Sequence, residues 1–135
     1  MKTSLINIPL MILLQYVLLP VHEIGHMIAF AAYGIPTTLS ITIVNGINLA
    51  MYTGPIGVTG IPPITVLVAG GLFAALIALP IAIKNPVYYY PVIYNLVWTI
   101  IEPLYVFGWL TINQITVIMF VTVPIYLVVL IVSYR

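Results

Sequence analysis

The two histidines of the chain lie four residues apart, in the segment His22-Glu23-Ile24-Gly25-His26. Residues at this spacing share one face of a helix, so both imidazoles can point at one metal ion while Glu23 lies beside the first of them. In this H-E-x-x-H arrangement the histidines bind zinc, and the glutamate takes a proton from a water molecule that the metal activates. The pattern therefore predicts a hydrolytic Zn²⁺ site with His22 and His26 as ligands and Glu23 as general base.

A third metal ligand must come from elsewhere in the chain, because a zinc site with an open catalytic position normally has three protein ligands. Apart from Glu23 the only acidic residue is Glu102, and there is no cysteine. We therefore expect Glu102 to be the third ligand. Pro103 follows it and disfavours helix at Glu102, so we expect the backbone to open there and turn the carboxylate toward its partners. A hydrogen bond between helices, or a salt bridge to Lys84, is the alternative role for this carboxylate.

The histidines have an alternative role as well. His22, Glu23 and His26 can form a hydrogen-bonded cluster that packs helices together, although Gln or Asn would serve that purpose at a lower cost of membrane insertion. Asn95 lies seven residues before Glu102, which is two helical turns away on the same face. Its amide could bind a substrate carbonyl or support an oxyanion, or it could join helices, and both interpretations stay open.

The composition places these residues in a membrane protein. The chain has 135 residues, of which 64% are hydrophobic and five are charged, and its mean hydropathy is +1.28. A soluble domain of this length would carry roughly 34 charged side chains, so a water-soluble monomer is excluded. Nucleic acid is excluded as a partner because no basic patch exists to neutralise phosphates. The absence of cysteine excludes disulfides and thiolate ligands.

Apolar runs of about 18 or more residues are candidate membrane spans. We expect the first span to kink or restart at Pro20 and to end at Gly34, since glycine suits a helix C-terminus. Clustered tyrosines that open the third span suit the interface between lipid and water. The four predicted transmembrane helices cover residues 5–33, 61–83, 87–107 and 115–134.

Residues 37–52 differ from a span, because β-branched and polar residues alternate on both sides of Asn45-Gly46. Asn-Gly between alternating runs is typical of a β-hairpin. Residues 54–63 form a loop rich in Gly and Pro, and residues 108–114 form a turn. The predicted fold is therefore a mainly α membrane protein with about four transmembrane helices and a membrane-associated β-hairpin after the first. All 135 residues form one integral-membrane domain.

The order of these parts resembles the site-2 protease family of intramembrane zinc metalloproteases. The resemblance covers about residues 10–107: the H-E-x-G-H helix, the hairpin, the small residues Ala69-Gly70-Gly71 in the next helix, and Asn95-Leu96 before an acidic residue. Three features differ from the family pattern. The acidic ligand is Glu102 before Pro103 rather than Asp before Gly, the Gly-Pro and Asn of the middle helix are absent, and no soluble regulatory domain is present.

The resemblance implies a zinc metalloendopeptidase in the cell membrane that cuts membrane-protein or transmembrane-peptide substrates in or near their spans. Substrate must unwind before its carbonyls can react, and an exposed hairpin edge can accept it as an added strand, with Asn48 facing the cleft. Asn95 is the second candidate substrate contact. The alternative is a non-catalytic membrane relative that binds metal or holds substrates.

Orientation in the membrane is left open by the sequence. With four spans, Lys2, Lys84 and Arg135 fall on one side, which the positive-inside rule assigns to the cytoplasm. The family resemblance implies the opposite orientation. Substrate identity and oligomeric state are likewise not specified by the residues.

Overall fold

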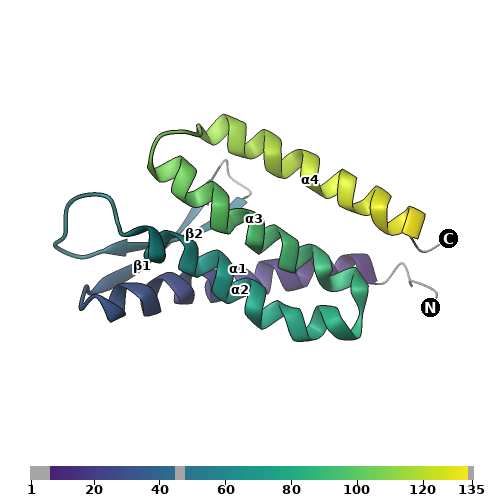
Figure 1. The fold of residues 1–135 in the computed structure, drawn as a ribbon, viewed down its shortest axis with the longest axis horizontal. Coiled ribbons are helices and arrows are strands. Elements are labelled where there is room, and N and C mark those ends of the chain that lie inside the picture. Colours follow the sequence, from purple (N-terminus) through teal and green to yellow (C-terminus); the bar gives the residue numbers. More distant parts are fainter. Residues whose placement is uncertain (1–6, 45–47, 134–135) are drawn as a thin grey trace.

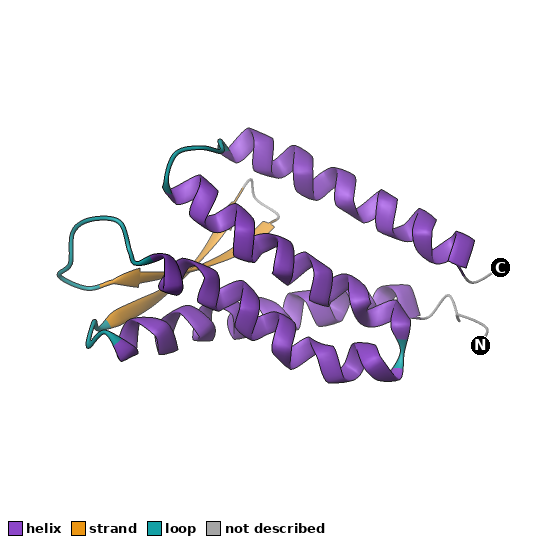
Figure 2. Ribbon diagram, in the orientation of Figure 1, coloured by secondary structure: helices purple, strands orange, loops and turns teal. Residues whose placement is uncertain are grey.

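The computed structural model describes residues 7–44 and 48–133 of the chain. It is mainly helical, with one two-stranded antiparallel sheet after the first helix, which confirms the predicted order of elements (Figures 1 and 2). The turn expected at Asn45-Gly46 lies outside the described residues. The elements are α1 (Asn7–Ala32), β1 (Thr37–Val44), β2 (Asn48–Pro55), α2 (Ile64–Lys84), the short 3-10 helix η1 (Pro86–Tyr88), α3 (Tyr89–Val106) and α4 (Ile112–Ser133).

The first helix ends where the sequence predicts. Gly34 has a φ of 69°, a left-handed conformation that glycine adopts without steric strain. The Ile35 N–H donates to the Phe30 carbonyl at 3.1 Å, which closes the helix in a Schellman motif. Contrary to one of the two outcomes expected at Pro20, the helix does not restart there, because α1 continues through this residue.

The hairpin packs against the first helix through its second strand. β1 and β2 pair from Thr37 opposite Pro55 to Val44 opposite Asn48, so the hairpin is three residues longer than predicted. Thr53 on β2 is buried, and its hydroxyl donates to the backbone carbonyl of Glu23 at 3.3 Å. The hairpin is therefore joined to α1 at the level of the candidate site.

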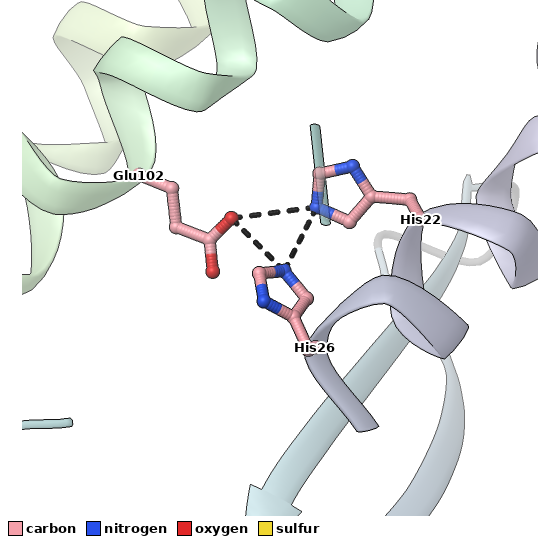
Figure 3. A group of neighbouring side chains, drawn as sticks. All are labelled: His22, His26 and Glu102. Carbon is pink, nitrogen blue, oxygen red and sulfur yellow. Dashed lines mark hydrogen bonds and ion pairs between the residues drawn. The ribbon is translucent and has the colours of Figure 1, made fainter. Parts of the chain in front are cut away.

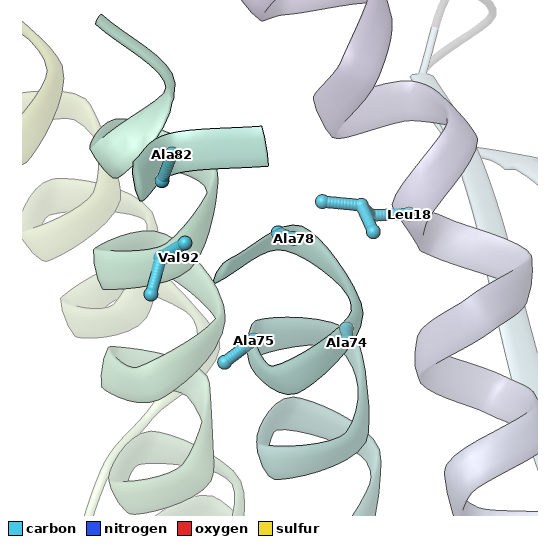
Figure 4. Packing of buried hydrophobic residues seen from close by; sticks show 6 residues of the cluster. All are labelled: Leu18, Ala74, Ala75, Ala78, Ala82 and Val92. Atoms are coloured by element: carbon cyan, nitrogen blue, oxygen red, sulfur yellow. The ribbon is translucent and has the colours of Figure 1, made fainter. Parts of the chain in front are cut away.

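The second helix lies between α1 and α3 and runs antiparallel to both (Figure 1). Small residues recur every four positions along its buried face, so neighbouring helices can approach its backbone closely. Leu18 of α1 and Val92 of α3 pack onto these residues from either side (Figure 4). The buried small residues of this face are Gly70, Ala74, Ala78 and Ala82.

Two glycines mark the closest helix crossings. A Cβ atom added to Gly25 of α1 would lie 2.7 Å from the carbonyl oxygen of Ala69 and 2.8 Å from Cβ of Phe73, both on α2. A Cβ atom added to Gly71 would lie 2.5 Å from Oγ1 and 2.8 Å from the backbone nitrogen of Thr99 on α3. A side chain at either glycine would therefore push apart two helices of the α1–α2–α3 unit.

The fourth helix begins three residues earlier than predicted, so the expected turn over residues 108–114 is too long. The reason is a capping box. The Thr111 hydroxyl accepts from the Gln114 backbone N–H at 3.4 Å, and the Gln114 side-chain oxygen accepts from the Thr111 N–H at 2.8 Å. Near the other end of α4, the Tyr126 hydroxyl lies 3.2 Å from each of the Pro86 and Val87 carbonyl oxygens.

Two of the described helices are long and apolar enough to cross a membrane, judged by length and composition. They cover Ile8–Ala32 and Ile64–Lys84. α2 begins at Ile64 rather than residue 61 because Pro62 and Pro63 precede it, and a residue that precedes proline disfavours helix.

Candidate metal centre

Three side chains from two helices converge at one point. His22 and His26 extend from α1, and Glu102 extends from α3 toward both of them (Figure 3). The two Nε2 atoms lie 3.0 Å apart, and Glu102 Oε2 lies 3.3 Å from His22 Nε2 and 3.2 Å from His26 Nε2. The structure therefore brings together the three residues predicted as ligands, although 80 residues separate His22 from Glu102.

The geometry of this triangle fits a metal ion. Ligand atoms of a tetrahedral ion bound at about 2.0–2.1 Å lie roughly 3.3 Å apart, so sides of 3.0 to 3.3 Å need little adjustment. The side chains are 13%, 6% and 22% exposed for His22, His26 and Glu102, so the site is shielded but reachable. These three residues can hold a metal ion.

A second helix orients one of the imidazoles. His26 Nδ1 lies 2.7 Å from the Val66 carbonyl oxygen of α2, a distance at which Nδ1 is the hydrogen-bond donor. Neutral His26 then carries its proton on Nδ1 and presents the Nε2 lone pair to His22 and Glu102. Metal-bound histidines typically have such a carbonyl partner on the opposite ring nitrogen. His26 Nε2 and Glu102 Oε2 thus face one another as electron-pair donors, an arrangement that a shared cation stabilises.

The backbone at Glu102 differs from the prediction. α3 continues as helix through Glu102 and Pro103, so the expectation that proline opens the backbone there is wrong. The carboxylate reaches the histidines because the two helix faces meet. Among the described residues Glu102 pairs with His22 and His26, whereas Lys84 lies exposed at the end of α2 and makes no ion pair with it.

Glu23 lies beside the triangle without belonging to it. Its side chain is 8% exposed, and its position on α1 directly follows His22. Within the described part of the chain no hydrogen bond reaches its carboxylate; the Thr53 contact is to its backbone oxygen. The role of the Glu23 carboxylate as general base stays a prediction.

Asn95 lies at a second contact between the same two helices. Its side-chain nitrogen donates to the Pro91 carbonyl at 2.8 Å and lies 3.5 Å from Gln15 Oε1 of α1. The Gln15 to Asn95 pair spans 80 residues, as does the His22 to Glu102 pair, so α1 and α3 keep one register over both levels. These contacts agree with the second role considered for Asn95, in which its amide joins helices. A role of Asn95 in substrate binding stays a prediction.

Asn48, the other residue predicted to contact substrate, begins β2 opposite Val44. Its side chain lies outside the described part of the structure, so its role also stays a prediction.

Sequence reasoning missed the contribution of α2 to the site. The Val66 carbonyl has no signal in the sequence, because any residue supplies a backbone oxygen. Gly70 lies one turn further along α2, and a Cβ atom added there would overlap His26 Nε2. Of the Ala69-Gly70-Gly71 segment, Gly71 packs against α3, whereas Gly70 lies against the imidazoles, a contact that the sequence does not predict.

Comparisons with protein-family models, curated proteins and solved structures found no match to this chain.

Proposed function

We propose that the chain is an intramembrane zinc metalloprotease that resembles the site-2 protease family and hydrolyses peptide bonds in or near transmembrane segments. One observation carries the proposal. The candidate ligand atoms of His22, His26 and Glu102 converge within 3.3 Å of one another, and Glu23 is the residue next to His22 on α1. Nitrogen and oxygen donors in this number are typical of catalytic zinc sites.

In this proposal all four helices cross the cell membrane. Support comes from their outward faces, which carry large apolar side chains that no other described element covers. Such surfaces are stable in contact with lipid and would drive aggregation in water. One example from each helix is Leu13 at 58% exposure, Ile83 at 65%, Ile100 at 64% and Val117 at 61%.

The chemistry assigns a role to each polar side chain of the site. His22, His26 and Glu102 would hold the ion, and the Val66 carbonyl fixes the orientation of His26. When bound, zinc supplies Lewis acidity that polarises a peptide carbonyl and makes water nucleophilic at neutral pH. Glu23 takes a proton from the attacking water as its oxygen adds to the carbonyl carbon. Glu23 then gives that proton to the amine nitrogen as the carbon–nitrogen bond breaks.

The substrate must present an extended segment to the site. Carbonyls within a transmembrane helix are hydrogen-bonded and hidden, so the helix has to unwind locally before water can attack. A hairpin edge can take up the unwound segment as a further strand, and Asn48 and Asn95 are the candidate polar contacts.

The test is metal content followed by cleavage. Protein purified in detergent and supplied with zinc should retain about one zinc per chain. Reconstituted in liposomes, it should cut a labelled single-span peptide that carries Gly and Pro near one end of the span, and cut a Leu-Ala span of equal length far more slowly, because that helix does not unwind. Cleavage is followed by separation of the fluorescent fragments.

Glu23→Gln is the matched control, since it keeps the size and packing of the side chain but cannot accept the proton. It should retain zinc and lose cleavage by about 10² to 10⁴-fold. Zinc retained with no cleavage by either protein would instead support a non-catalytic metal-binding membrane protein. A wild-type protein that retains no metal would overturn both functions and leave the histidines as packing groups.

A further inference from the structure

Gly70 of α2 faces the metal-binding atoms directly. A Cβ atom added to it would overlap His26 Nε2 and lie 2.7 Å from both Nε2 and Cδ2 of His22. These are the two nitrogens that would bind the ion, each at about 2.0–2.1 Å. The space that a side chain at this position would fill is therefore next to, and partly the same as, the space that the metal needs.

Gly70 and Val66 act from the same face of α2, because they are one helical turn apart. The Val66 carbonyl holds His26 by its Nδ1 at 2.7 Å, while the bare backbone at Gly70 lies against its Nε2. α2 thus orients the imidazole through a hydrogen bond at Nδ1 and places no side chain against Nε2. It closes this side of the site without offering a side-chain ligand of its own.

We propose that Gly70 is a positioning residue of the metal site: the missing side chain keeps the space between the two Nε2 atoms open, so that an ion can bind there with α2 as a wall rather than a ligand. The inference rests on the metal site of the proposed function. It goes further by assigning a metal-binding role to a residue that carries no donor atom.

The rival explanation is that Gly70 only lets helices pack. Gly71 provides the comparison, because it is the next residue of the same buried helix. A Cβ atom at Gly71 would meet α3, at the carbonyl oxygen of Asn95 and at Thr99, and the atoms that it would meet first include none of the histidines. Gly70→Ala and Gly71→Ala therefore add the same methyl group to a crowded position, but only the first places it against the imidazoles, whereas the second acts on the site through the position of α3.

The experiment is a titration of wild type, Gly70→Ala and Gly71→Ala with Co²⁺ alone in detergent, followed by its visible absorption and by metal analysis after dialysis. Thermal unfolding of each metal-free protein is measured in parallel. We expect both variants to lose stability. Gly70→Ala should weaken Co²⁺ binding by more than about 10-fold and change the absorption spectrum, whereas Gly71→Ala, which displaces α3 but places no atom beside the imidazoles, should weaken it by a smaller factor. Equal Co²⁺ affinity in the two variants would overturn the inference while leaving the wild-type metal site intact.

A second measurement covers the case in which Gly70→Ala is too unstable to titrate. In a background that carries both His22→Ala and His26→Ala the added methyl group has room, so Gly70→Ala should reduce the melting temperature by less than half of its effect in the wild-type background. An equal reduction in both backgrounds would show that the methyl group does not meet the imidazole, and would contradict the proposal. A wild-type protein that fails to bind Co²⁺ would overturn the metal site and this inference with it.

Discussion

The contacts that hold α1, α2 and α3 together differ from those that hold α4 against these three helices. Within the unit, glycines and alanines bring helix backbones together, and an added methyl group at Gly25 or Gly71 would lie within 2.8 Å of atoms on the neighbouring helix. α4 lies along the outside of α3 (Figure 1), and a tyrosine hydroxyl near its far end supplies its described hydrogen bonds to another helix. All three candidate ligands belong to the unit.

The difference indicates which interactions the site depends on. The candidate ligand atoms of α1 and α3 come within about 3 Å of one another only if both helices keep a fixed distance from α2. Close packing against Gly and Ala leaves little freedom in that distance. α4 can shift without moving a ligand. Substitutions in the two regions should therefore separate loss of metal binding from loss of stability.

The largest effect is expected for Glu102→Ala. It removes the only ligand that α3 provides, so zinc affinity should fall by more than about 100-fold, measured by competition with a chromogenic chelator. Lys84→Ala removes an exposed charge at the end of α2 and should leave affinity unchanged. Zinc affinity within about 3-fold of wild type in Glu102→Ala would show that the ion is held elsewhere.

Gly25→Ala tests the close crossing of α1 and α2. The added methyl group would lie 2.7 Å from the Ala69 carbonyl oxygen, so the helices must separate or shift. We expect a loss of about 1–3 kcal/mol in the free energy of unfolding, measured by denaturant titration in mixed micelles, together with weaker zinc binding. Ile24→Ala, at an exposed neighbouring position, should have the smaller effect on both. A larger effect of Ile24→Ala than of Gly25→Ala would show that the close crossing of α1 and α2 is not at Gly25.

Tyr126→Phe tests the attachment of α4. Loss of the hydroxyl removes its contacts with the Pro86 and Val87 carbonyls at 3.2 Å. The free energy of unfolding should fall by about 1 kcal/mol, while zinc affinity should not change, because no ligand moves. Tyr105→Phe, on the half-exposed surface of α3, is the matched control for removal of a hydroxyl. A drop in zinc affinity with Tyr126→Phe would mean that α4 supports the site after all.

Thr53→Val tests the contact between hairpin and α1 and should have the smallest effect. The substitution keeps the side-chain shape and removes the 3.3 Å hydrogen bond to the Glu23 carbonyl. Hydrogen bonds between elements inside membranes average about 0.6 kcal/mol, so we expect a loss of that order in thermal or denaturant unfolding, with zinc content unchanged. A loss above about 2 kcal/mol would show that the hairpin organises α1 rather than resting on it.

Much of this organisation could be predicted from local sequence. The H-E-x-x-H spacing predicted that His22 and His26 share one helix face. Gly34 predicted the end of α1, and the alternating residues around Asn45-Gly46 predicted the hairpin. Glu102 could be predicted because the chain has only one acidic residue besides Glu23. The signals for the histidines, the end of α1 and the hairpin each lie within a few residues, where backbone geometry determines the outcome, whereas Glu102 was predicted by elimination.

The wrong or missing predictions concern one proline, one capping pattern and one contact between helices. Pro103 was expected to open the helix, yet α3 continues through it to Val106. The Thr111 to Gln114 capping box was overlooked, although its pattern is visible in the sequence. The contact of Gly70 with the imidazoles depends on the depth at which two helices cross, and no local pattern specifies that depth.

The 80 residues between His22 and Glu102 also set a time at which the site can form. At synthesis rates of about 5–20 residues per second, the histidines would leave the ribosome roughly 4 to 16 s before the glutamate. During that interval α1 offers two ligands without the third. A metal ion would therefore bind tightly only after α3 has packed against α1 and α2. Bound metal would then indicate that the three helices have assembled.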